Sequence, residues 1–340
     1  MCGDNDLKGQ RCEVGSQIEI VMRPSTDAST KARPLTAFNV DEVADLIRRE
    51  IHQCEMQTFD AVEACRILLA AGSMIGTLVD QIVPGRAVRA IGVGGAAFVE
   101  RSFASSERDH PAPGLNERVL RSAFRPPGVA LTARQIANGW SEGLTVAVIL
   151  HNWFEGEPES SQKEIRRCLM TTFLDDLSGY NLSELIVEAP AERHMQWALN
   201  GGFRVRSAYD EWYRENLEPQ PRRMLFGITR EEALKAESSL LSLMFHYQPP
   251  RFDFTPSQRR LLAYAVQLKT DSEIADHFGI SLSAVKKSWA AIFEKVGNLL
   301  PTDASETASD TSDDRAGIRG AQKRHRLLSY LRNHPEEFRP

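Results

Sequence analysis

The sequence lacks several features that would assign it to a broad class of protein. It has no apolar run near the roughly 18 residues of a membrane-spanning helix, and its first residues, MCGDNDLKGQRCEVGSQ, lack the apolar core of a signal peptide. Its five cysteines show neither CxxC nor Cys/His spacing, so neither a disulfide framework nor a zinc site is indicated. We therefore expect a cytoplasmic protein with no membrane association and no metal site.

A surplus of positive charge is also missing. The net charge is −5, with 42% apolar and 26% charged residues, which is an ordinary composition for a globular protein. This balance excludes a chain that is basic all over, but not a small basic surface on one domain. At 340 residues the chain is long enough for about two domains.

Strand-like and helical patterns interleave over most of the chain. Strand-like runs cover 87–93, 96–103, 144–150, 185–188, 204–209 and 223–227, and helical patterns cover 40–51, 59–69, 163–177, 192–199 and 233–247. We expect a disordered arm (1–36), an α/β or α+β domain for sensing or dimerisation (37–235), a connecting helix and hinge (236–254), a compact all-α unit (255–300), an acidic linker (301–320) and a basic amphipathic tail (321–340).

The all-α unit carries explicit helix-capping signals. Thr255 and Thr270 each begin a capping box, Gly279 suits the left-handed residue that ends a helix, and Ser281 can cap the next helix at once. Three helices joined by such short turns predict a helix-turn-helix. At 100° per residue, the third helix has an apolar sector that includes Val285 and an opposite sector of small and cationic residues.

The stretch FTPSQRRLLAYAVQLKTDSEIADHFGISLSAVKKSWAAIFEKVG resembles the DNA-binding domain of LuxR-type transcription regulators. The resemblance covers about 45 of the 340 residues and implies a third helix that enters the major groove of double-stranded DNA, usually in a homodimer. Ala284, Ser288, Gln258 and Arg260 depart from the family pattern, which puts phosphate contacts and operator preference in doubt. The implied DNA-binding residues are Thr270, Ser283, Lys286, Lys287, Ser288 and Lys295, and the basic tail adds Lys323, Arg324 and Arg326 for contacts with phosphates. That tail could equally dock its leucines on a neighbouring surface.

The N-terminal region weakly resembles the late part of a GNAT acetyltransferase. The stretch LIVEAPAERHMQWALNGGFRVRSAYDEWY, preceded by LTVAVILHNWF and a helix at 163–177, carries this resemblance. It implies a coenzyme A site whose pyrophosphate loop is glycine-rich, but QKEIRR at 162–167 has no glycine. We therefore expect a degenerate GNAT-like or other α/β domain reused for sensing or dimerisation. The GxGxxA pattern of Gly92, Gly94 and Ala97 predicts a turn or bend between strands rather than a nucleotide site.

The leading hypothesis is a DNA-binding transcription regulator that is not an enzyme. It would have a sensor-like α/β (or α+β) domain, with an unknown small-molecule effector, followed by a LuxR-type helix-turn-helix domain. No catalytic residue and no cofactor is indicated, and His151, His194 and His246 are isolated in the sequence. The alternative is an acyl-CoA-dependent acetyltransferase with a fused helical adaptor domain.

Overall fold

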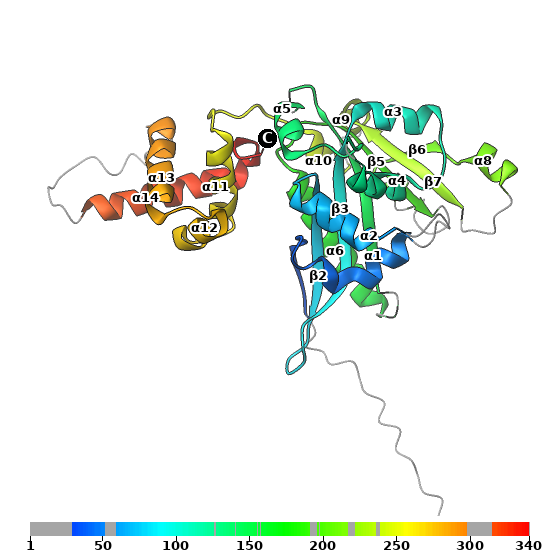
Figure 1. The fold of residues 1–340 in the computed structure, drawn as a ribbon, viewed down its shortest axis with the longest axis horizontal. Helices are drawn as coiled ribbons and strands as arrows, with labels where there is room; N and C mark the ends of the chain where they lie inside the picture. Colours follow the sequence, from blue (N-terminus) through cyan, green and yellow to red (C-terminus); the bar gives the residue numbers. More distant parts are fainter. Residues whose placement is uncertain are drawn as a thin grey trace, which may run out of the picture.

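A mixed α/β sheet domain and a smaller group of helices make up the part of the chain that the structure describes (Figure 1). The computed structural model describes residues 29–339 except 52–58, 126, 140, 155, 157, 191–195, 197, 217–221, 236–238 and 298–314. Within these ranges, no helix has the length and apolar content needed to cross a membrane.

A seven-stranded sheet forms the centre of the first domain, in the order β1-β2-β3-β4-β5-β7-β6. Neighbouring strands are antiparallel except for β4 and β5, which are parallel. The strands are β1 (Ser29–Pro34), β2 (Met74–Ile82), β3 (Arg89–Val99), β4 (Leu144–Trp153), β5 (Leu182–Pro190), β6 (Arg204–Ser207) and β7 (Arg223–Thr229).

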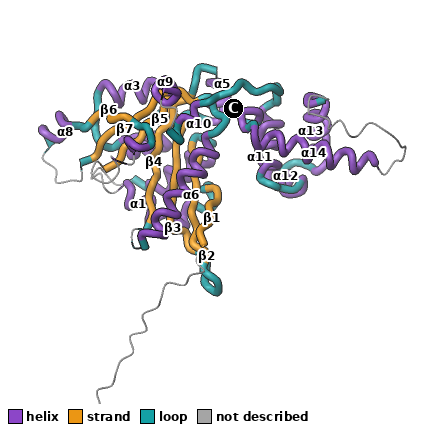
Figure 2. The backbone as a smooth tube through the Cα atoms, turned by 180° about the vertical axis from the view of Figure 1, so that it is seen from behind, coloured by secondary structure: helices purple, strands orange, loops and turns teal. Residues whose placement is uncertain are grey.

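Helices cover both faces of the sheet, which is why its central strands are apolar on both sides (Figures 1 and 2). On one face lie α1 (Ala44–Ile51), α2 (Ala61–Ala70) and α4 (Leu115–Arg121). On the other lie α6 (Glu159–Leu177), α9 (Arg230–Lys235) and α10 (Ser242–Phe245). The other helical elements of this domain are η1 (Val40–Val43), α3 (Arg101–Asp109), η2 (Ser122–Phe124), α5 (Ala133–Gly139) and α8 (Asp210–Glu215).

Glycines in β3 allow α6 to lie close to the sheet. A Cβ atom on Gly92 would stand 2.7 Å from Ile165 Cγ2, and one on Gly94 would stand 3.2 Å from Leu169 Cδ2. Glycine in a strand often marks such a close approach. The turn that we expected at these glycines is therefore wrong, because β3 runs through them as one strand.

The C-terminal helices share a separate apolar core. They are α11 (Pro256–Val266), α12 (Asp271–Phe278), α13 (Leu282–Val296) and α14 (Arg315–Asn333). The predicted caps are confirmed: Thr255 and Thr270 form capping boxes, Gly279 has φ of 62°, and the Ser281 side chain accepts from the N–H of Ala284.

The end of the chain joins these helices to the sheet domain. Glu337, in η3 (Pro335–Glu337), is buried and accepts hydrogen bonds from the backbone N–H groups of Arg251 and Phe252, both at 2.9 Å. Arg339 donates to the carbonyl of Asp175 at 2.9 Å and lies 5.3 Å from the centre of the Tyr180 ring. The tail therefore packs against the last turn of α6 and the segment after it.

Several elements differ from the sequence-based prediction. Residues 29–34, expected in the arm, form β1, and 101–103, expected at the end of a strand, form the start of α3. The connecting helix expected at 233–247 is instead two short helices, α9 and α10. Most of the helix expected at 192–199 and most of the acidic linker lie outside the described residues.

Candidate active site

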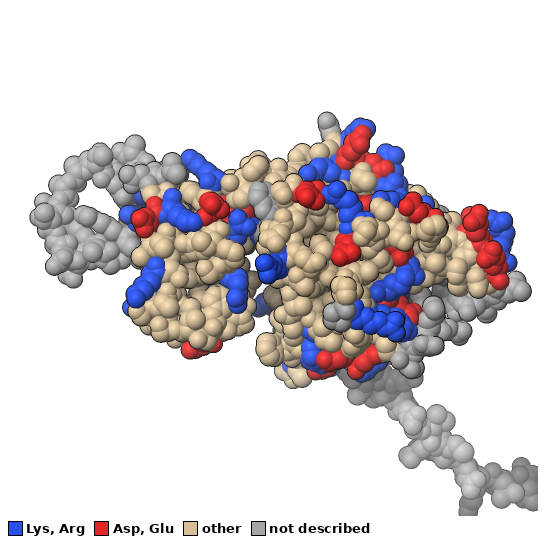
Figure 3. Space-filling view, turned by 45° about the horizontal axis from the view of Figure 1, so that its top comes forward, with Lys and Arg blue, Asp and Glu red and all other residues tan. Residues whose placement is uncertain are grey.

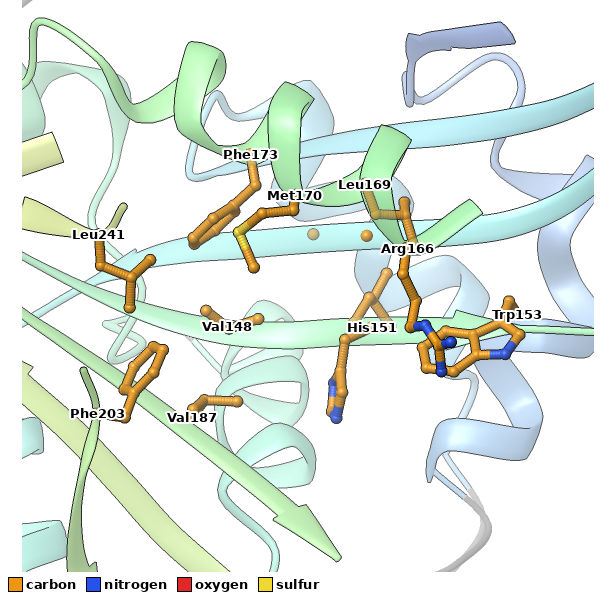
Figure 4. A pocket seen from close by; sticks show the side chains of 13 residues that line it. Val148, His151, Trp153, Arg166, Leu169, Met170, Phe173, Val187, Phe203 and Leu241 are labelled. Atoms are coloured by element: carbon orange, nitrogen blue, oxygen red, sulfur yellow. The ribbon is translucent and has the colours of Figure 1, made fainter. Parts of the chain in front are cut away.

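An apolar cavity of about 180 Å³ lies between α6 and the sheet (Figure 4). Val148 of β4, Val187 of β5 and Leu169, Met170 and Phe173 of α6 contribute to its wall. Among the described residues that line it, only His151 and Arg166 have titratable side chains. Such a combination of apolar walls and a few convergent polar groups is typical of a small-molecule site.

The cavity lies where the two parallel strands part. The pairing of β4 with β5 runs from Leu144↔Leu182 to Val148↔Val187, but β4 continues to Trp153 and β5 to Pro190. Beyond Val148 and Val187, the facing edges of these strands no longer hydrogen-bond to each other. The Trp153 N–H donates to the Asn152 side-chain oxygen at 2.8 Å, and the other backbone groups on those edges can bond a ligand that enters between the strands.

A β-bulge in β4 decides which side chains face the cavity. Gly95 pairs with Leu150 and Ala96 with Val148, so Ile149 is an extra residue between them. An extra residue reverses the alternation of side chains along a strand. Val148, His151 and Trp153 consequently all lie on the α6 side of the sheet.

Helix α6 supplies the opposite wall and a positive charge. Arg166, Leu169, Met170 and Phe173 are spaced so that they share one side of a helix. The Arg166 guanidinium lies 5.6 Å from the centre of the Trp153 ring. The same end of the cavity therefore holds a guanidinium group and the His151 imidazole (Figure 4).

The segment that leads into α6 does not fit a pyrophosphate held by backbone N–H groups. The sequence from Phe154 to Pro158, FEGEP, has one glycine and two glutamates, and Glu159 adds a carboxylate in the first turn of the helix. Negative side chains at a helix N-terminus compete with a bound phosphate. Positive charge is present nearby, because Arg89 and Arg49 lie 4.5 and 5.2 Å from the centre of the Phe154 ring.

A buried ionic cluster supports β5 from the opposite face. Glu188, the residue after Val187, is fully buried and accepts hydrogen bonds from the N–H groups of Gly114 (2.8 Å) and Leu115 (3.0 Å) and from the Tyr209 hydroxyl (3.0 Å). The Arg223 Nε atom lies 2.8 Å from its other oxygen. Burial, followed by the charge of Glu188, raises the pKa of Tyr209, which keeps this hydroxyl protonated as a donor. The cluster fixes β5 beside the opening.

A metal site is not indicated for this region. Among the described residues, no group of three or more His, Cys, Asp or Glu side chains is arranged to hold a metal ion.

The residues that we assigned to DNA binding lie in the C-terminal helices and not at the cavity. Thr270 caps α12, Ser288 is half-buried and donates to the Ala284 carbonyl at 3.1 Å, and Lys295 bonds the Asp253 carbonyl. Ser283, Lys286 and Lys287 on α13 and Lys323 on α14 are exposed, and Arg326 is half-buried.

Arg324 has an internal role. It forms an ion pair with Asp271 at 2.8 Å and lies 4.5 Å from the centre of the Trp289 ring.

In the view of Figure 3, lysine and arginine side chains are scattered among acidic ones rather than gathered into one patch.

No family model and no curated protein matches this sequence. Solved structures do match over the sheet domain. FeeM, an N-acyl amino acid synthase from uncultured soil microbes, is 15% identical, with a TM-score of 0.38 over 64% of this chain and 98% of its own. NAA60 of Arabidopsis thaliana with a bisubstrate analogue is 14% identical, with a TM-score of 0.36 over 59% and 98%. A mosquito arylalkylamine N-acetyltransferase-like protein is 12% identical, with a TM-score of 0.36 over 59% and 100%. Because these TM-scores are below 0.5, the similarity concerns the general fold and does not identify catalytic or binding residues in this chain.

These matches contradict the interpretation of the chain as a DNA-binding transcription regulator. They are acyltransferases and cover 59 to 64% of the chain, whereas the LuxR resemblance rested on about 45 residues. The expectations of a non-enzyme, of LuxR-type regulation and of double-stranded DNA as the partner are therefore corrected. The physical reason is that capping and an amphipathic third helix describe how helices pack, which does not require DNA.

The cavity residues were not among the sites predicted from the sequence. His151 was expected to be isolated, because the sequence around it shows no metal-ligand or catalytic-triad spacing. The spacing from Arg166 to Phe173 on one side of α6 was visible, but its partner across the cavity depends on the bulge at Ile149.

Proposed function

We propose that the sheet domain is an N-acyltransferase, which moves an acyl group from a pantetheine thioester to an amine, with the C-terminal helices as an accessory domain. The observation that carries the proposal is the parting of β4 and β5 after Val148 and Val187, directly beside the cavity that His151 faces. This proposal develops the alternative hypothesis of an acetyltransferase, which the GNAT resemblance suggested.

The unpaired strand edges suit the pantetheine arm. Pantetheine is an extended chain with two amide groups, and an extended amide chain can add to an exposed strand edge by main-chain hydrogen bonds. Donors and acceptors on the edge of β4 beyond Val148 supply such bonds. The thioester then lies next to the cavity, where its acyl group can leave water.

His151 is the residue that we assign to proton transfer. An attacking amine forms a C–N bond with the thioester carbonyl while the C–S bond breaks. The proton lost from nitrogen passes to the His151 imidazole, and the imidazolium returns it to the departing thiolate. The products are an amide and a thiol, and no other reactant is needed. Histidine is the side chain that most often carries such proton transfers in enzymes.

The donor can be an acyl-coenzyme A or an acyl group on the phosphopantetheine arm of a carrier protein. Both present the same thioester and pantetheine. The acidic segment before α6 disfavours the pyrophosphate of coenzyme A, whereas the arginines beside Phe154 can meet a single phosphate.

The test uses the full chain with a mixture of primary amines and three donors: acyl-pantetheine, acyl-coenzyme A and an acylated carrier protein. Thiol release and amide mass report turnover, and the ratio of rates identifies the donor. We expect His151→Gln to lower kcat/KM by about 10²–10⁴-fold. His246→Gln, at an exposed histidine, is the matched control. The absence of turnover with every donor, or full activity of His151→Gln, would refute the proposal.

A further inference from the structure

We infer that the cavity holds a medium-length acyl chain of about six to eight carbon atoms, so the enzyme prefers such donors to acetyl donors. This inference rests on the proposed function and names its substrate class. It is carried by the shape, the lining and the volume of the cavity.

The cavity has one polar end and one apolar end. His151 and Arg166 lie toward Trp153, whereas Phe173, Phe203 and Leu241 lie at the opposite end (Figure 4). None of the described residues that line this far end has a polar side chain. A ligand with a reacting carbonyl near His151 would therefore direct an apolar tail toward Leu241.

The volume sets the length of that tail. An apolar cavity of about 150 Å³ accommodates benzene, with six carbons, and this cavity measures about 180 Å³. An acetyl group has only one methyl group beyond the thioester carbonyl, so it would leave most of the cavity empty. The side chains that line the cavity would then lack dispersion contacts with the ligand. A chain of about six to eight carbons fills it.

Leu241 lies at the apolar end of the cavity and has a matched exposed neighbour. Leu241 is 2% exposed and Leu243 is 61% exposed. Leu241 is the N-cap of the short helix α10, and Leu243 lies within that helix. Leu241→Ala removes three carbons from the end of the cavity, whereas Leu243→Ala removes the same atoms from the surface. Val148→Phe, on the wall formed by β4, adds bulk to the cavity instead.

The experiment measures dissociation constants by calorimetry for a series of acyl-pantetheines from acetyl to dodecanoyl, with the full chain and no amine. For the wild type, we expect each added methylene up to about eight carbons to lower Kd about fourfold, with no further gain beyond. We expect Leu241→Ala to move the optimum two or three carbons longer and Val148→Phe to move it shorter, while Leu243→Ala leaves it unchanged. A variant that is merely damaged would weaken binding of all chain lengths alike.

Two negative outcomes are distinguishable. Acetyl-pantetheine that binds as tightly as octanoyl-pantetheine, or an optimum that neither cavity variant moves, would overturn the inference and leave N-acyl transfer standing. Failure of every member of the series to bind would overturn the proposed function itself, and the inference with it.

Discussion

Replacing Glu188 by alanine should destabilise the sheet domain strongly. Its carboxylate accepts hydrogen bonds from two backbone N–H groups and the Tyr209 hydroxyl, and it pairs with Arg223, which is 4% exposed. The variant would leave that guanidinium buried without its counter-charge. Breaking a buried pair in this way costs about 3–5 kcal/mol. We therefore expect the free energy of unfolding to fall by about that amount.

Urea denaturation followed by tryptophan fluorescence measures this change. The matched control is Glu231→Gln, which removes an exposed i,i+4 ion pair with Lys235 and should change the free energy of unfolding by less than about 0.5 kcal/mol. A loss below about 1 kcal/mol for Glu188→Ala would refute the argument that this cluster holds β5 beside the opening.

Three further outcomes follow from the packing and charges of the sheet domain. Gly92→Ala should lower the free energy of unfolding by about 1–3 kcal/mol, because its new Cβ would lie 2.7 Å from Ile165 Cγ2; an unchanged urea midpoint would contradict the close approach of α6. Burial, followed by the charge of Asp60, raises the pKa of Cys65 to about 12, so peptide mapping after iodoacetamide treatment at pH 8 should find this thiol unlabelled in the native protein. Burial alone would raise the pKa of Glu232, but Arg206 and the Thr229 N–H lower it to about 2. In the unfolded chain the pKa of Glu232 is higher, at about 4.5. The ionised Glu232 therefore stabilises the fold above about pH 4.5, and this stabilisation is lost as the pH falls toward 2. Glu232→Gln should accordingly flatten the pH dependence of stability in that window, and an unchanged profile would argue against the pair.

The sequence predicted the elements whose patterns are local. The helix caps at Thr255, Thr270 and Ser281 were predicted correctly, because a helix cap depends only on residues within one turn. The apolar side of α13, which includes Val285, was also predicted correctly, since 3.6-residue periodicity fixes which side chains share a face.

Elements that depend on distant partners were missed. Strand β2 contains Thr77 and Asp80, which break an apolar pattern but are buried in the fold. Thr77 donates to Asp176 at 3.2 Å and Asp80 pairs with Arg33 at 2.6 Å. Such partners are invisible to a search along the chain.

The candidate site was missed for a related reason. The direction of His151 depends on one extra residue in β4, and the cavity depends on where two strands stop pairing. Both are properties of register, which neighbouring strands set together. The function was misread because the most regular sequence pattern lies in the C-terminal helices, away from this cavity.

A crystal structure of the full chain with octanoyl-pantetheine tests the central claim most directly. We expect the pantetheine amides within hydrogen-bond distance of the β4 backbone beyond Val148, the thioester carbonyl beside His151 and the octanoyl chain between α6 and the sheet. A ligand bound elsewhere, or β4 and β5 paired to their ends with no opening between them, would contradict it.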